Sequence, residues 1–207
     1  MDDSVTVVVP TRDEADRIGG IVATLVATYD VLVVDDGSDD ATAAAAEAAG
    51  ASVVSHDVPQ GRAEALRTGF DQATGDIIAL FEPSGAYDPG EVDDVVAPIV
   101  AGEADIVFGT RPALDRLSEW TLNKLVTRTT GVPDPSTDVW AIRALALPHI
   151  SVGPACDCGV VALAATAADL RIEAVGISSQ ELTGPRDLAW YHFRQLGAVF
   201  RHLIVGR

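Results

Sequence analysis

One short segment combines carboxylates with turn-forming residues in a way that suits the binding of a polar ligand. Asp35 and Asp36 stand together directly before Gly37 and Ser38. The two carboxylates can accept hydrogen bonds from a base ring and a ribose, and Gly37-Ser38 allows a tight turn beside such a ligand. Capping of the next helix would account for Ser38 or Asp39, but not for the paired acids before the glycine.

A second polar segment runs from Pro10 to Glu14. Each segment follows a short β-branched run that predicts a strand. If both strands belong to one parallel sheet, the segments meet at its carboxyl edge, where ligands of open α/β sheets bind. A dinucleotide-binding turn is set aside because it needs glycines directly after the first strand, and none occurs before Gly19.

The elements that must position these segments alternate between strand and helix. The patterns predict an α/β fold with a doubly wound, mainly parallel sheet flanked by helices. The expected strands cover residues 4–9, 31–34, 51–55, 76–81, 105–108, 139–143 and 171–177. The expected helices cover residues 14–28, 39–49, 62–73, 91–100, 117–129 and 159–169.

The length of 207 residues favours a single domain over residues 1–207. The end of the chain differs in charge from the rest, because its arginines face few acids. Residues 186–207 are expected to form a basic, apolar helix that packs on the domain or faces an anionic membrane. Cys156 and Cys158 are one residue apart, which suits neither a mutual disulfide nor a zinc site, so we expect reduced thiols.

Acidic residues dominate the charge. The formal net charge is −17, from 31 acids against 14 bases, and Lys124 is the single lysine. This balance favours adaptation to a salty cytoplasm over an acidic surface for a basic partner, and it disfavours nucleic-acid binding. No apolar run approaches the roughly 18 residues that span a bilayer. The acidic start does not match a signal peptide, so a cytoplasmic location is expected.

Further motifs follow in a consistent order along the chain. They are Gln60-Gly61-Arg62, Gly75-Asp76, Tyr87-Asp88-Pro89, Gly109-Thr110-Arg111, Asn123 and Asp134-Pro135-Ser136-Thr137. With the two polar segments, this order resembles that of family 2 glycosyltransferases, in particular polyprenyl-phosphate (dolichyl-phosphate) mannose and glucose synthases. The resemblance implies a GT-A fold, a UDP- or GDP-hexose donor, a polyprenyl phosphate acceptor and peripheral contact with the inner face of the cell membrane.

The resemblance also assigns roles to individual residues. Those expected to bind the nucleotide sugar are Pro10, Thr11, Arg12, Glu14, Asp35, Asp36, Arg62 and Asp76. Those expected to act in catalysis are Glu82, Arg111 and Arg186. An ordinary surface ion pair is the competing interpretation of each arginine.

The metal motif of the family is altered here. The usual Asp-x-Asp after the fourth strand, which binds a divalent cation on the sugar diphosphate, reads Glu82-Pro83-Ser84. Glu82 remains a candidate ligand for Mg²⁺ or Mn²⁺, whereas the neutral hydroxyl of Ser84 is a poor one. Asp138 stands where glycine is usual, and Trp140 where a basic residue is usual.

The altered motif leaves two main hypotheses. An acceptor phosphate is already anionic near neutral pH, so no strong base is needed, but the leaving diphosphate needs a metal or fixed cations. Guanidinium groups suit phosphate, and the candidates are Arg12, Arg62, Arg111 and Arg186. The first hypothesis is an inverting hexosyltransferase. The second is a weak or inactive paralogue that binds a nucleotide sugar or a partner enzyme. A third hypothesis, a sugar nucleotidyltransferase, is disfavoured because this chain lacks the glycine-rich turn that such an enzyme has after its first strand.

Overall fold

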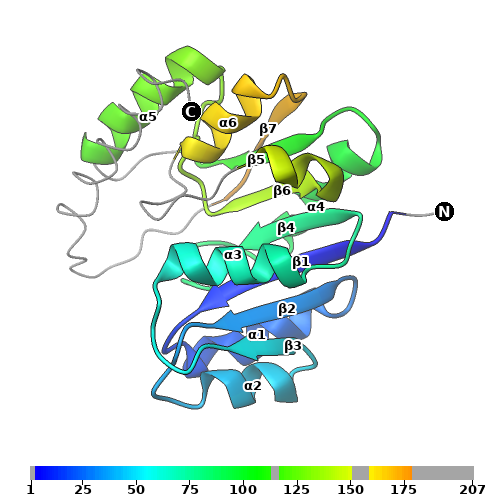
Figure 1. The fold of residues 1–207 in the computed structure, drawn as a ribbon, viewed down its shortest axis with the longest axis vertical. Helices are drawn as coiled ribbons and strands as arrows, with labels where there is room; N and C mark the ends of the chain where they lie inside the picture. Colours follow the sequence, from blue (N-terminus) through cyan, green and yellow to red (C-terminus); the bar gives the residue numbers. More distant parts are fainter. Residues whose placement is uncertain (1–2, 113–116, 151–158, 179–207) are drawn as a thin grey trace.

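A computed structural model describes residues 3–112, 117–150 and 159–178 (Figure 1). In these residues a seven-stranded sheet has the order β3-β2-β1-β4-β6-β5-β7. Its strands are β1 (Val5–Thr11), β2 (Asp30–Asp35), β3 (Ser52–Ser55), β4 (Ile77–Phe81), β5 (Ile106–Thr110), β6 (Val139–Arg143) and β7 (Ile172–Gly176). All neighbours are parallel except β6, which runs antiparallel to both β4 and β5. The prediction of a mainly parallel α/β sheet is confirmed.

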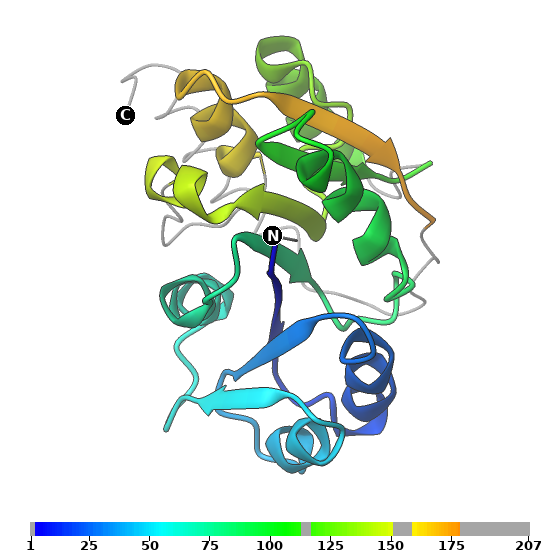
Figure 2. The ribbon, with the colours of Figure 1, turned by 90° about the vertical axis from the view of Figure 1, so that its right-hand side faces the viewer.

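Helices cover both faces of the sheet. They are α1 (Ala15–Leu25), α2 (Thr42–Ala48), α3 (Arg62–Gln72), α4 (Glu91–Val100), α5 (Leu117–Thr130) and α6 (Val160–Ala167), with a 3₁₀ helix at Ala144–His149. Figure 2 shows α1 and α4 on one face and α3 and α6 on the other. Two apolar cores result because side chains alternate between the faces of a strand.

The two cores divide β1 residue by residue. Val8 packs with Leu66 and Phe70 of α3 on one face, whereas Val7 and Val9 pack on the other face with the apolar side of α1. Helix α3 approaches the sheet closely, since a Cβ atom at Gly69 would lie 2.3 Å from Cγ1 of Val8. Glycine is therefore required at this crossing.

Most predicted elements are present, with shifted ends. Strand β6 and helix α4 have the expected bounds, whereas β1 continues through Pro10 and Thr11. Proline lacks the N–H that a central strand uses, but the ladder from β1 to β4 ends at Val8 while that to β2 continues to Thr11. Pro10 is thus in a part of the strand with one neighbour. The 3₁₀ helix was not predicted.

The carboxyl ends of β1, β2 and β4 lie at one edge of the sheet, together with the start of the antiparallel β6. This edge carries the loops that contain most of the sequence-predicted site residues. Within the described ranges, no helix combines the length and apolarity needed to cross a membrane. Cys156, Cys158 and the segment 186–207 lie outside the described residues.

Candidate functional site

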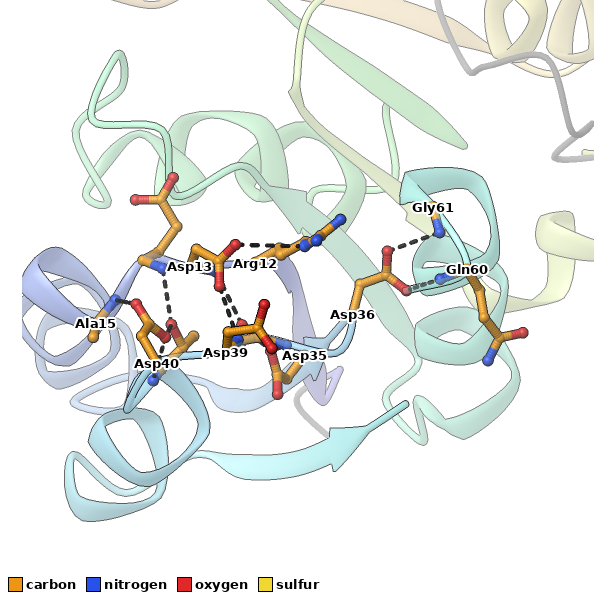
Figure 3. Close-up of polar contacts among 12 residues, drawn as sticks. Arg12, Asp13, Ala15, Asp35, Asp36, Asp39, Asp40, Gln60 and Gly61 are labelled. Carbon is orange, nitrogen blue, oxygen red and sulfur yellow. Dashed lines mark hydrogen bonds and ion pairs between the residues drawn. The ribbon is translucent and has the colours of Figure 1, made fainter. Parts of the chain in front are cut away.

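The loops that follow β1 and β2 are joined by hydrogen bonds from backbone amides to side chains (Figure 3). The Asp13 amide donates to Oγ of Ser38 at 2.9 Å, and the Asp39 amide donates to Oδ1 of Asp13 at 3.0 Å. The Glu14 amide donates to Oγ1 of Thr42 at 2.8 Å. Asp13 has a φ of 54°, a left-handed conformation in which aspartate and asparagine are enriched. The two loops therefore form one surface.

Asp35 closes the turn that begins the second loop. Its Oδ1 accepts a hydrogen bond from the Ser38 amide at 3.2 Å and another from the Ser38 hydroxyl. Gly37 in this turn has a φ of 67°, and a Cβ atom there would lie 2.8 Å from the Pro59 backbone nitrogen. The turn thus packs against the segment that precedes α3, and both conformation and space call for glycine.

Asp36 points the other way, toward the start of α3 (Figure 3). Its Oδ1 accepts a hydrogen bond from the Gln60 amide and its Oδ2 one from the Gly61 amide, both at 2.8 Å. Nδ1 of His56 lies 2.8 Å from Oδ1, and Nε2 of His56 lies 3.0 Å from Oγ1 of Thr68. Burial acts to raise the pKa of Asp36, but the hydrogen bonds from Gln60, His56 and Gly61 outweigh it and lower this pKa. Asp36 is therefore held as a carboxylate.

A triad of charges lies where α3, β4 and β6 meet. Arg62 is the first residue of α3, Glu82 follows β4, and Asp138 precedes β6. The Arg62 guanidinium contacts Glu82 through Nη1, and its Nη2 lies 2.9 Å from Oδ1 of Asp138. The three side chains are 25 to 31% exposed. Glu82, the candidate metal ligand, is therefore ion-paired to Arg62.

The Ser84 end of the altered motif is held by a second arginine. Nη1 of Arg17 in α1 donates to the Ser84 carbonyl oxygen at 2.6 Å, and Nε of Arg17 lies 2.8 Å from Oε2 of Glu14. Gly85 leaves room for this contact, since a Cβ atom there would lie 3.3 Å from Nη1 of Arg17. Glu14, predicted to bind the nucleotide sugar, is thus connected through Arg17 to Ser84.

Arg111 forms a buried pair with Asp134, whose side chain is 2% exposed. Nε and Nη2 of Arg111 donate to the two carboxylate oxygens at 2.7 and 2.9 Å. Nδ2 of Asn123 donates to Oδ1 of Asp134 at 2.8 Å, while Oδ1 of Asn123 is buried without a hydrogen-bond partner. Arg111, predicted to be catalytic, therefore fixes the loop before β6, and Asp134 offsets its charge.

Tyr87 lies beside this loop. Burial raises the pKa of its hydroxyl above the ordinary value, and the negative charge of Asp138 adds to that rise, while Arg111 opposes it. The raised pKa keeps the Tyr87 hydroxyl neutral near neutral pH, so Tyr87 offers a neutral hydroxyl near Asp138 and no charge.

The structure does not bring every expected residue to this edge. Asp76 precedes β4 and accepts hydrogen bonds from the amide and hydroxyl of Ser4 at 3.0 and 2.8 Å. Glu82 follows the same strand, which rises about 3.3 Å per residue. Asp76 therefore lies at the opposite end of β4 from Glu82, and the assignment of Asp76 to the donor is corrected. Asp76 instead joins the starts of two strands. Arg186 lies outside the described residues.

The remaining expected residues lie at the edge itself. Thr11 is buried at the end of β1, and its Oγ1 has no hydrogen-bond partner. Pro10 is buried beside it. Arg12 is half-exposed, with Nε 3.5 Å from Oδ2 of Asp13. Two residues were missed: Arg17, signalled by its position three residues after Glu14, and His56, signalled by its position directly after a predicted strand.

The residues at the altered motif do not fit a divalent cation. Glu82 and Asp138 both contact Arg62, and the Ser84 hydroxyl is neutral and buried. Divalent cations of this class favour carboxylate and phosphate oxygens. In the part of the chain that the structure describes, no group of three or more histidine, cysteine, aspartate or glutamate side chains could hold a metal ion.

The fold is shared with solved glycosyltransferases. Glucosyl-3-phosphoglycerate synthase of Mycobacterium tuberculosis superposes with a TM-score of 0.79 at 23% identity, over 96% of this chain and 80% of that chain. A structure of the same enzyme with Mn²⁺, UDP-glucose and phosphoglyceric acid gives 0.79 at 22% identity, over 96% and 79%. Mannosyl-3-phosphoglycerate synthase of Rubrobacter xylanophilus gives 0.79 at 20%, over 99% and 75%. The fold is therefore GT-A.

Residues 6–139 match the model of the Glycosyl transferase family 2, and the chain belongs to this family. An uncharacterized glycosyltransferase of Mycobacterium tuberculosis is 38% identical over 109 residues, 53% of this chain and 49% of the relative. An undecaprenyl-phosphate 4-deoxy-4-formamido-L-arabinose transferase of Sodalis glossinidius is 30% identical over 149 residues, 62% of this chain and 45% of the relative. The chain thus spans about half the length of the curated relatives it matches.

Proposed function

We propose that the chain transfers a hexose from a UDP- or GDP-sugar to a polyprenyl phosphate, with inversion, at the inner face of the cell membrane. The observation that carries this proposal is the placement of Asp36 at the edge where β1 and β2 end, held as a carboxylate by three contacts. Membership of family 2 supports the transferase reaction. Relatives whose names state transfer to polyprenyl phosphates support the acceptor.

Asp36 is suited to the base of the donor. A carboxylate oxygen can accept two hydrogen bonds, and Oδ2 of Asp36 accepts one described bond, from Gly61. Uracil and guanine each present a ring N–H, which such an oxygen can accept. The buried Oγ1 of Thr11 lies without a partner at the end of the neighbouring strand. We assign Pro10, Thr11 and Asp35 to the nucleoside, and the half-exposed Arg12 to its phosphate side.

The acceptor needs little activation from the protein. A phosphate oxygen, already anionic near neutral pH, attacks the anomeric carbon from the face opposite the nucleotide. The bond to that oxygen forms as the bond to the leaving diphosphate breaks, and the nucleoside diphosphate departs with the electron pair. No proton is removed, so the task of the chain is to orient the two reactants and meet the leaving charge.

Residues near the acceptor side are assigned by their positions. Arg111, paired with Asp134, fixes the loop that ends at Asp138, and so orients the edge on which the acceptor would lie. Arg186 is assigned to a phosphate. The other arginines of the segment 186–207, which are Arg194, Arg201 and Arg207, are assigned to an anionic membrane surface, which polybasic apolar segments bind.

Transfer is tested directly with the full chain in high salt. Radiolabelled UDP-glucose or GDP-mannose is incubated with a short polyprenyl phosphate, and lipid-linked sugar is extracted and counted. We expect transfer by the wild type and a loss of about tenfold or more for Asp36→Ala. Asp71→Ala, which removes an exposed carboxylate from α3, is the matched control and should behave as the wild type. Equal transfer by both variants would contradict the role of Asp36.

A second candidate is a protein that binds a nucleotide sugar but transfers it slowly or not at all. The observation that favours it is the pairing of Glu82 with Arg62 together with the buried Ser84 hydroxyl. Calorimetric binding of UDP or GDP, without transfer or hydrolysis in the assay above, would select this candidate over the enzyme.

A further inference from the structure

The altered motif lies between two guanidinium groups of the chain. Arg62 contacts the Glu82 carboxylate, and Arg17 donates to the Ser84 carbonyl oxygen at 2.6 Å. The two arginines come from α3 and α1, which lie on opposite faces of the sheet (Figure 2). The segment Glu82-Pro83-Ser84 is therefore fixed at both ends by positive charges that belong to the protein.

Arg62 engages the acidic oxygens at the point where a metal would need them. Its guanidinium contacts Glu82 and places Nη2 2.9 Å from Oδ1 of Asp138. Like charges at such short range repel strongly in a partly buried site, so a divalent cation and this guanidinium cannot share the same carboxylate oxygens. The remaining candidate ligand, Ser84, has a neutral, buried hydroxyl. Such a hydroxyl is a poor replacement for a carboxylate ligand of a divalent cation.

We propose that Arg62 stands in the place of a divalent cation, so that the chain binds its nucleotide without added metal. The inference rests on the proposed function, because it concerns the same donor. Guanidinium groups match phosphate oxygens in geometry, and Arg62 contacts the carboxylate of the altered motif. Counted formally, Glu82, Asp138 and Arg62 together carry one net negative charge. Removing the charge of Glu82 should therefore favour the binding of a diphosphate.

The test is a calorimetric titration of the full chain with UDP and with GDP in high salt, once with EDTA and once with Mn²⁺. We expect the wild-type Kd to agree within about threefold between the two buffers, and Arg62→Ala to bind about tenfold or more weakly in EDTA. Adding Mn²⁺ should restore much of the affinity of Arg62→Ala, because a guanidinium group then no longer competes with the metal at Glu82 and Asp138.

Arg67→Ala is the matched control. It removes the same charge from the same helix, and Arg67 is exposed and pairs with Glu64 of its own helix. Its nucleotide affinity should equal that of the wild type in both buffers. Bound Mn²⁺, counted by electron paramagnetic resonance without nucleotide, should rise in Arg62→Ala and not in Arg67→Ala, which separates a specific site from attraction to an acidic surface.

Glu82→Gln provides a second variant if Arg62→Ala does not fold. The proposal expects tighter nucleotide binding in both EDTA and Mn²⁺, because a like charge is removed beside the diphosphate, whereas the loss of a metal ligand would weaken binding in Mn²⁺. Wild-type binding that improves tenfold or more with Mn²⁺, or Arg62→Ala that binds like the wild type in EDTA, would overturn the inference. Failure of the wild type to bind either nucleotide in both buffers would contradict the proposed function itself.

Discussion

The two halves of the candidate site are held together in different ways. The loops after β1 and β2 are joined by amides that donate to short side chains such as Asp13, Ser38 and Thr42. The loops after β4 and β5 are joined to the loop before β6 by guanidinium groups, chiefly Arg62 and Arg111. Short side chains reach only the amides of an adjacent loop, so the first half depends on the close approach of its two loops. Long arginine side chains reach across elements, so the second half is joined by charges that come from separate helices and loops.

Removal of Asp134 should break the second half most severely. Asp134→Ala leaves the Arg111 guanidinium buried without its carboxylate, and we expect a loss of about 3 to 5 kcal/mol of unfolding free energy. Urea unfolding in high salt measures it. The comparison variant is Asp105→Ala, which breaks a more exposed pair with Arg171 and should cost about 1 kcal/mol or less. Equal losses would show that burial does not set the strength of these pairs.

Crowding the turn at Gly37 should be the strongest disturbance of the first half. Gly37→Ala adds a Cβ atom 2.8 Å from the Pro59 nitrogen in a left-handed conformation, and we expect a loss of about 1 to 3 kcal/mol. Nucleotide affinity should fall with it, because Pro59 belongs to the segment that Asp36 holds. Gly20→Ala, with open space around the added atom, should leave stability unchanged or slightly higher.

Asp36→Asn is expected to change the unfolding free energy least among these destabilising variants. The amide keeps the shape but loses the charge and one acceptor, so at neutral pH we expect a loss of about 1 to 2 kcal/mol. The folded-state pKa of Asp36 is lowered from 3.8, so its contribution is present above about pH 4 and is lost as the pH falls through the folded value. The difference between wild type and variant in urea unfolding should therefore shrink below pH 4. A constant difference from pH 7 to pH 3 would show that the charge has no part in it.

Sequence patterns sufficed for the sheet and for the turn at Gly37 because those features are local. The β-branched runs and the turn at Gly37 carry their own conformational preferences. The pairing of Arg62 could not be predicted, since its partners lie 20 and 76 residues away in the chain. Asp76 was misplaced for a related reason. The sequence shows that Asp76 precedes a strand, but it does not show that this strand begins next to β1, where Ser4 donates to Asp76.

The reversed direction of β6 has a consequence for how such a chain can diversify. Because β6 begins at the edge where the parallel strands end, the loop before it delivers Asp134 and Asp138 to the site without belonging to any strand–helix crossover. We therefore expect substitutions and length changes in that loop to leave the register between β1 and β2 intact. One side of the candidate site could then change its shape while the loops after β1 and β2 keep theirs.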